Sequence, residues 1–304
     1  MTRLIFATRP STLARWQTRW VIDALQHLHP DLICEGTVIT TQGDRILDKP
    51  LPEIGGKGLF TGELEHELRI GSVDCAVHSL KDLPVEASDG LTIGCIPWRA
   101  EARDALVSSR DLTLDTLPEH AVVGTSSLRR SAQLLAVRPD LRIESLRGNV
   151  DTRIRKVLQG QYDAVILAGA GLARLGLEQH VKQWLPLDVM LPAPGQGALA
   201  VQCRASDRST LELLSALEDA ATRRAVTAER SFLAGLGGGC SVPVAAFANT
   251  EEVVILRGVV ASIDGRRLIR VSGEGKDPAA LGRQLAEQAL AQGAGEILGL
   301  RSLP

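Results

Sequence analysis

Short apolar runs alternate with amphipathic stretches over the first two thirds of the chain. The runs at residues 4–8, 74–78 and 163–167 have the length and composition of buried β-strands. After the first run, apolar residues recur at helical spacing over residues 12–28, and Ser11 is a suitable N-cap for that helix. This alternation of strand and helix predicts an α/β architecture.

The same order of elements occurs twice. Residues 74–77 resemble residues 163–165 as the start of a strand, and residues 7–11 resemble residues 124–127 as a turn from a strand into a helix. The repetition predicts two lobes that are built on one α/β plan.

The last third of the chain follows a different plan. A helix predicted over residues 220–234 leads into a glycine-rich stretch. Strands predicted at 253–262 and 268–272 are separated by an Asp-Gly pair, which is a hairpin signal, and a helix over 278–292 closes the chain. These elements predict a small α+β domain.

The predicted fold class is therefore α/β, with two doubly wound lobes that resemble type-2 periplasmic binding proteins, plus a small α+β C-terminal domain. Proline-containing segments at 97–99 and 192–197 are the candidate crossovers between the lobes. The predicted domains are residues 1–97 with 198–216 for the first lobe, 98–197 for the second lobe, and 217–304 for the domain that carries a cysteine loop.

Composition narrows the possible partners of the chain. A hydrophobic content of 44% with 23% charged residues is typical of a globular protein, and neither an apolar run of membrane-spanning length nor a signal-peptide pattern is present. A net charge of −2 and only 3% aromatic residues argue against nucleic-acid binding. The five cysteines are odd in number and widely spaced, which argues against a zinc site or a disulfide framework. We therefore expect a cytoplasmic protein without a metal, nucleic-acid or membrane partner.

Basic residues gather where predicted strands end and helices begin. Helix N-termini carry a partial positive charge and favour anions, so arginines in a first turn, such as Arg129, Arg130, Arg153 and Arg155, repel that charge unless an anion binds there as well. Arginine also grips planar carboxylates through two parallel hydrogen bonds. Each arginine by itself is best interpreted as a surface charge, but five such loops together predict a polycarboxylate site.

Two other side chains have a functional and a structural interpretation. Asp82 is a carboxylate among basic loops: it either neutralises Lys81 or faces a positive centre on the substrate, and we favour the second role. His78 could act as a base, but a histidine on an apolar strand is more often part of the core.

The stretch around Cys240 reads Gly-Leu-Gly-Gly-Gly-Cys-Ser-Val-Pro. Because consecutive glycines cost conformational entropy, this backbone needs a structural reason. A thiol on a loop without neighbouring side chains is open to covalent attachment. The alternative is a glycine helix stop followed by a small buried cysteine, and the stretch alone supports both interpretations equally.

Taken in order, the motifs resemble one family, porphobilinogen deaminase, over nearly the whole chain. The matching segments are residues 7–14 (ATRPSTLA), 55–60 (GGKGLF), 76–84 (AVHSLKDLP), 123–130 (VGTSSLRR), 145–150 (SLRGNV) and 194–198 (PGQGA). The resemblance implies a cytoplasmic, monomeric transferase of three domains. It would join four porphobilinogen units head to tail, with release of ammonia, to give hydroxymethylbilane for tetrapyrrole biosynthesis, including that of heme.

The resemblance also implies a role for individual residues. Cys240 matches the cysteine that holds a dipyrromethane cofactor through a thioether, which favours the attachment interpretation of its loop. Asp82 matches the catalytic carboxylate that faces the pyrrole nitrogens and also contacts the cofactor. The implied holders of the cofactor carboxylates are Lys81, Ser127, Arg129, Arg130 and Arg153, and the implied substrate contacts are Arg9, Ser11, Arg147, Arg153 and Arg174.

One position departs from the family pattern, and two other classes of protein remain as alternatives. Gly237 stands where the family usually has Glu, which predicts a more flexible attachment loop. A two-lobed anion-binding protein would explain the basic loops but neither the cysteine loop nor the third domain. A cysteine hydrolase using Cys240 with His78 would leave the basic loops without a role.

Overall fold

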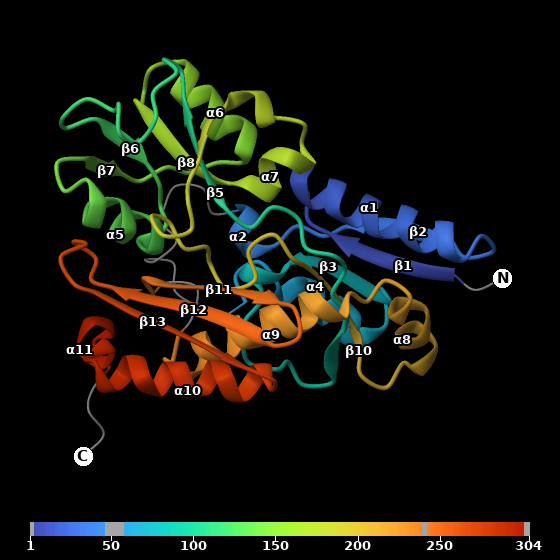
Figure 1. The fold of residues 1–304 in the computed structure, drawn as a ribbon. Helices are drawn as coiled ribbons and strands as arrows, with labels where there is room; N and C mark the ends of the chain where they lie inside the picture. The colour runs from blue at the N-terminus through green and yellow to red at the C-terminus, as the bar shows by residue number, and fades with distance from the viewer. Residues whose placement is uncertain (1–2, 46–57, 239–241, 301–304) are drawn as a thin grey trace.

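The computed structural model of the chain describes residues 3–45, 58–238 and 242–300 (Figure 1). These residues form two five-stranded sheets and one three-stranded sheet. Figure 1 shows the sheet with β6 and β8 above, the sheet with β1 and β3 beside it, and the C-terminal three-stranded sheet below. The sequence predicts two lobes with the same arrangement of elements, so the strand orders of the two five-stranded sheets can be compared.

The first sheet has the strand order β2-β1-β3-β10-β4. β1 pairs in parallel with β2 and β3, whereas β10 pairs antiparallel with β3 and β4. The strands are β1 (Arg3–Thr8), β2 (Ile33–Val38), β3 (Cys75–Ser79), β4 (Leu91–Cys95) and β10 (Leu199–Arg204). Three parallel strands are thus followed by one antiparallel strand that arrives late in the sequence.

Helices cover both faces of this sheet. Consecutive residues of β1 point to opposite faces, so Phe6 packs in the cluster with α1, and Ala7 packs in the cluster with α4. The predicted N-cap of α1 is confirmed, because Ser11 Oγ accepts a hydrogen bond from the backbone N–H of Ala14 at 3.2 Å. The helical elements here are α1 (Thr12–Leu28), α2 (Gln42–Arg45), α4 (Gly62–Ile70), the 3₁₀ turn η1 (Leu80–Asp82) and α8 (Arg208–Ser215).

The second sheet repeats this topology with the order β7-β6-β8-β5-β9. β6 pairs in parallel with β7 and β8, and β5 pairs antiparallel with β8 and β9. The antiparallel strand of each sheet, β10 or β5, is the first strand that the chain forms after leaving the other sheet. The strands are β5 (Asp104–Ser108), β6 (Val122–Gly124), β7 (Arg142–Glu144), β8 (Ala164–Ala168) and β9 (Val181–Trp184). The two lobes predicted from the sequence repetition are confirmed.

Helices of the second lobe start where its strands end. They are α5 (Leu128–Val137), α6 (Val150–Leu158), α7 (Gly169–Arg174) and the 3₁₀ turn η2 (Glu178–His180). The strand β7 is short. β7 ends at Glu144 because the backbone N–H of Leu146 bonds Ser126 Oγ at 3.0 Å instead of a neighbouring strand.

The C-terminal domain is an antiparallel sheet with helices packed on one face. Its order is β11-β12-β13, and α9 and α10 share one core with the sheet. Gly282 lets the two helices approach closely, since a Cβ there would lie 2.4 Å from the carbonyl oxygen of Ala228. The elements are α9 (Ala220–Gly235), β11 (Val244–Thr250), β12 (Val254–Ala261), β13 (Leu268–Gly275), α10 (Pro278–Ala291) and α11 (Ala294–Leu298).

The predicted fold class, α/β with two lobes and a small α+β domain, is confirmed by these sheets. The residue boundaries proposed for the domains stay a prediction. Among the helices of the described segments, none has the length and apolar character needed to cross a bilayer.

Candidate active site

A buried carboxylate, Asp104 at the start of β5, organises the first turn of α5. Its oxygens accept hydrogen bonds from Arg129 Nη1 at 2.7 Å and from Arg130 Nε and Nη2 at 3.0 and 2.7 Å. Asp104 is 0% exposed, and the two arginines are 5% and 6% exposed. Burial alone would raise the pKa of Asp104, but the two guanidinium groups hold it well below its usual range.

This arrangement corrects part of the sequence argument. The sequence predicts that an incoming anion offsets the repulsion between Arg129, Arg130 and the helix N-terminus, whereas in the structure Asp104 already supplies a carboxylate to both arginines. Asp104 itself was missed. It is the first residue of an apolar strand, and a carboxylate leading a buried strand is the signal that could have drawn attention to it.

The second part of the site is the turn η1, directly after β3 in the first lobe. Lys81 Nζ donates a hydrogen bond to Gln196 Oε1 at 3.3 Å, and Gln196 Nε2 donates to Asp104 Oδ1 at 3.0 Å. Burial lowers the pKa of Lys81 to about 8, and the charge of neighbouring Asp82 opposes that shift. Gln196 thus connects the Lys81–Asp82 turn of one lobe to the buried carboxylate of the other.

Arg153, near the start of α6, extends the site in the second lobe. Its Nε donates to the carbonyl of Gly148 at 2.7 Å. Burial, together with the positive charges of Arg130 and Arg147, lowers the pKa of Arg153 to about 10, while the charge of Asp82 raises it. Asp82, which is exposed, therefore lies within electrostatic range of Arg153 from the opposite lobe.

Other predicted residues are held by local contacts. Arg9 forms two hydrogen bonds with Asp44, of 3.2 and 2.5 Å, and its guanidinium lies 4.2 Å from the ring centre of Phe60. Ser11 caps α1, as described above. Arg174 donates to the carbonyl of Gly197 at 2.8 Å, and burial lowers its pKa to about 10. Arg9 and Arg174 are both half-buried. Arg9 is paired with Asp44, and Arg174 is hydrogen-bonded to the backbone of Gly197.

Two side chains have a clear structural function. Ser127 is the N-cap of α5, with its Oγ accepting a hydrogen bond from the backbone N–H of Arg130. His78 is 5% exposed and shares a hydrogen bond of 3.1 Å with Gln202. Burial lowers the pKa of His78 to about 4, so the histidine is neutral at physiological pH. The interpretation of His78 as a core residue is confirmed.

The end of α9 explains one departure from the family pattern. Gly237 has φ +65°, a left-handed conformation that favours glycine, and its N–H bonds the carbonyl of Ala234. The N–H of Gly238 returns to the carbonyl of Leu233, so these glycines stop the helix. A Glu side chain at position 237 would be strained in this conformation. Cys240 lies outside the described residues.

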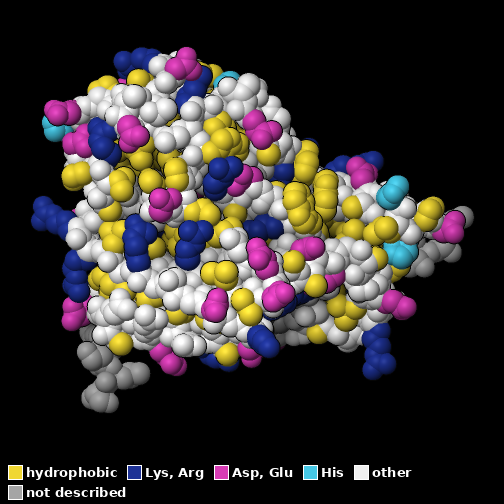
Figure 2. All heavy atoms as spheres, viewed as in Figure 1, with side chains coloured by type: hydrophobic (Ala, Val, Ile, Leu, Met, Phe, Trp, Pro, Cys, Tyr) yellow, Lys and Arg dark blue, Asp and Glu magenta, His cyan; other side chains and the backbone are white. Residues whose placement is uncertain are grey.

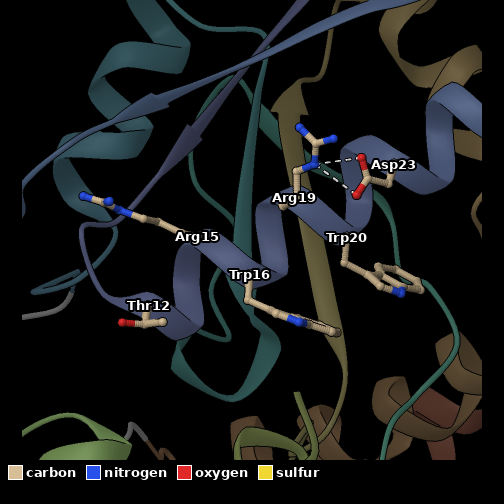
Figure 3. Close-up of a pocket in the computed structure, with 6 residues that line it drawn as sticks. All are labelled: Thr12, Arg15, Trp16, Arg19, Trp20 and Asp23. Carbon is tan, nitrogen blue, oxygen red and sulfur yellow. Dashed lines mark hydrogen bonds and ion pairs between the residues drawn. The ribbon is translucent and has the colours of Figure 1, made fainter. Parts of the chain in front are cut away.

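No predicted site residue lines the cavity of about 430 Å³ on the outer face of α1 (Figure 3). Figure 3 shows Arg19 paired with Asp23, and the indoles of Trp16 and Trp20 on the same helix. Figure 2 shows positive and negative side chains interspersed on the visible face of the protein.

Cationic groups are thus in excess where the two lobes meet. Lys81, Arg129, Arg130, Arg147 and Arg153 gather with two carboxylates, Asp82 and Asp104. Such donors suit a ligand that carries several carboxylates. Across the described segments, no group of three or more His, Cys, Asp or Glu side chains is arranged to hold a metal ion.

The fold and site define a three-domain α/β protein in which cationic side chains of both lobes surround a Lys-Asp turn. A family model described as "Porphobilinogen deaminase, dipyromethane cofactor binding domain" matches residues 4–212, and one described as its C-terminal domain matches residues 223–291. The chain belongs to the porphobilinogen deaminase family.

Curated relatives agree over almost the full length. A porphobilinogen deaminase of Brevibacillus brevis is 55% identical over 293 residues, which cover 96% of this chain and 95% of the relative. That of Roseiflexus castenholzii is 52% identical over 297 residues, covering 97% and 98%. That of Moorella thermoacetica is 50% identical over 301 residues, covering 98% and 96%.

Solved structures with a similar shape are more distant. The periplasmic VFT2 domain of Bordetella pertussis BvgS has a TM-score of 0.41 at 16% identity, covering 70% of this chain and 85% of that domain. The BenM effector binding domain with its effector benzoate also has a TM-score of 0.41, at 11% identity, covering 71% and 91%.

Proposed function

We propose that this chain polymerises four porphobilinogen units head to tail, with release of ammonia, to give hydroxymethylbilane for tetrapyrrole biosynthesis. It is a transferase that uses a dipyrromethane cofactor. The observation that carries this conclusion is the Lys81–Asp82 turn, whose exposed carboxylate lies among cationic groups of both lobes.

The cofactor fits the residues that the chain offers. It carries carboxylates, and Lys81, Arg129, Arg130 and Arg153 supply cationic donors for them, with Ser127 as a neutral donor. Asp104 offsets part of the charge of Arg129 and Arg130, so that a bound carboxylate would share these guanidinium groups with Asp104. Cys240 would hold the cofactor through a thioether. When bound, the cofactor supplies the pyrrole carbon to which the first substrate unit is added.

The incoming substrate has its own set of contacts in this proposal. Arg9, Ser11, Arg147, Arg153 and Arg174 would bind the acetate and propionate groups of porphobilinogen. Burial lowers the pKa of Arg153 and of Arg174 to about 10, so both remain cationic at neutral pH. Because arginine forms two parallel hydrogen bonds with a carboxylate, these residues would also fix the orientation of the pyrrole ring.

Asp82 would carry the chemistry. When the amino group of porphobilinogen's aminomethyl substituent leaves as ammonia, the methylene carbon stays on the ring and positive charge develops on the pyrrole nitrogen. A carboxylate held near that nitrogen stabilises the charge as it forms and accepts a hydrogen bond from the N–H. The same carboxylate can hold a proton for the leaving amine and receive one when the coupled ring regains aromaticity. Its exposure to solvent, in contrast to buried Asp104, leaves it accessible to substrate.

Cytoplasmic location, a monomeric state, and the absence of nucleic-acid and membrane partners complete the proposal. The balanced charge and the low aromatic content argue against a nucleic-acid partner, and the sequence has no apolar run of membrane-spanning length. The odd, widely spaced cysteines support a cytoplasmic location, and the family resemblance implies a monomer.

The experiment that tests the proposal combines mass and activity. The purified protein should have an intact mass that exceeds the sequence mass by two pyrrole units. With porphobilinogen it should release one ammonia per pyrrole consumed and yield hydroxymethylbilane. An unmodified chain that neither acquires pyrrole units from porphobilinogen nor releases ammonia would refute the proposal.

A further inference from the structure

Arg230, on the third turn of α9, reaches from the C-terminal domain into the first lobe. Its Nη1 donates to the carbonyl of Leu83 at 2.9 Å and lies 3.4 Å from that of Leu80, and its Nη2 donates to the carbonyl of Pro84 at 2.6 Å. One guanidinium group therefore holds three backbone carbonyls, which come from both sides of Lys81 and Asp82 in the sequence.

The same helix face supports this turn with an apolar contact. Val226 lies one helical turn before Arg230, and it packs in a buried cluster with Leu80 and Leu83. Within the turn, the N–H of Leu83 bonds the carbonyl of Leu80 at 3.2 Å. The backbone that carries Asp82 is thus fixed on both sides to α9, while the carboxylate itself remains exposed.

α9 also leads directly to the glycine stretch that contains Cys240, because the helix ends at Gly235. One rigid helix therefore connects the turn with the catalytic carboxylate to the segment of the proposed cofactor attachment. We infer that Arg230 is a positioning residue, which sets where Asp82 stands relative to the reacting pyrroles. This inference rests on the proposed function of Asp82.

The expected consequence is kinetic. A carboxylate that stabilises developing charge loses effect when it moves, and a misplacement of about 1 Å can cost on the order of 10²-fold in rate. Replacing Arg230 removes none of the side chains that would touch cofactor or substrate. It should therefore reduce kcat while KM, which depends on the arginines that bind carboxylates, changes little.

The test compares Arg230→Met, Arg230→Lys and the wild type as holoenzymes whose cofactor content is verified by mass. Methionine keeps the apolar stem and the helix propensity but removes the donors. We expect kcat of Arg230→Met to fall by about 10- to 100-fold with KM within about 3-fold. Arg230→Lys retains a cation with three donors and should recover most of the loss in kcat.

Arg223→Met is the matched control, because Arg223 lies on the same helix and bonds Glu218 and the carbonyl of Ile93, not the turn. It should lower the melting temperature without lowering kcat.

Equal kcat values for Arg230→Met and the wild type would overturn the positioning role, as would an equal loss of kcat in Arg223→Met. If Arg230→Met does not fold, Arg230→Gln, which keeps one donor group, is compared in the same way. Failure of the wild type itself to release ammonia would instead refute the proposed function.

Discussion

Arg99 and Glu229 form a buried ion pair, in which Nη1 and Oε1 are 2.6 Å apart and Nη2 and Oε2 are 3.1 Å apart. Arg99 lies in the first crossover between the lobes, and Glu229 lies on α9. The carboxylate, which is 0% exposed, also accepts the backbone N–H groups of Gly195 and Ala248 at 2.7 and 2.8 Å. A single side chain thereby connects both crossovers to the C-terminal domain.

Glu229→Gln should therefore destabilise the whole protein. The amide keeps the shape but leaves Arg99 buried without a countercharge, which typically costs about 3–5 kcal/mol in the free energy of unfolding. Denaturant unfolding measures the loss. The control is Glu296→Gln, which breaks the exposed pair with Arg267 and should change stability by less than about 1 kcal/mol. Similar losses in both variants would contradict a special role for the Glu229 carboxylate.

Asp104→Asn should show a pH-dependent loss of stability. The pKa of Asp104 is held below its usual range in the folded protein, so its charge stabilises the fold above about pH 4, the usual value in an unfolded chain. That contribution disappears as the pH falls through the folded-state pKa. The difference in unfolding free energy between wild type and variant should thus be largest near pH 7 and narrow below pH ~4. A difference that is constant from pH 7 to pH ~3 would show that Asp104 acts only through its shape.

Cys240→Ala should abolish cofactor attachment, because a thioether needs sulfur. Intact-mass measurement should then find only the bare polypeptide after incubation with porphobilinogen. Cys34→Ala is the control, since Cys34 is half-buried on β2 and should leave the mass increment unchanged. A dipyrrole that persists in Cys240→Ala would mean that another cysteine carries it.

Asp82→Asn should leave a folded protein with a defect in turnover. The amide preserves shape and removes the charge, so we expect a loss on the order of 10²-fold or more. The measurement is single-turnover release of ammonia by protein that is supplied with preformed cofactor. Asp89→Asn, an exposed change in the loop that follows, should retain the wild-type rate. Near wild-type release by Asp82→Asn would show that Asp82 only neutralises Lys81.

Lys81 should make cofactor loading sensitive to alkaline pH. Because burial lowers its pKa to about 8, Lys81 loses its positive charge as the pH rises through that value, and its attraction for cofactor carboxylates falls. The rate at which apoprotein acquires cofactor should decline with a midpoint near pH ~8. Lys81→Arg stays charged up to pH ~12, so its profile should lack this step. Identical profiles for both proteins would exclude Lys81 as the titrating group.

The sequence by itself determined the elements and the chemical character of the site. Strand and helix periods reflect which face of each element is buried, so α1, α9 and α10 could be located to within a residue or two. The basic loops could be recognised because arginine at a helix start is locally unfavourable, and the ordered motifs indicated the family.

The tertiary structure decided which of these charges meet. Asp104 is about 25 residues from Arg129 and 92 from Gln196, and nothing in local sequence specifies these contacts. They arise because β5 enters its sheet antiparallel, beside β8, and brings its first residue to the starting end of α5. Arg230 and the turn that it holds are likewise about 147 residues apart. The local hydrophobic period shows which side of a helix or strand is buried. Which buried charges pair with one another depends on the order of the strands in the sheets, and that order is set only when the chain folds.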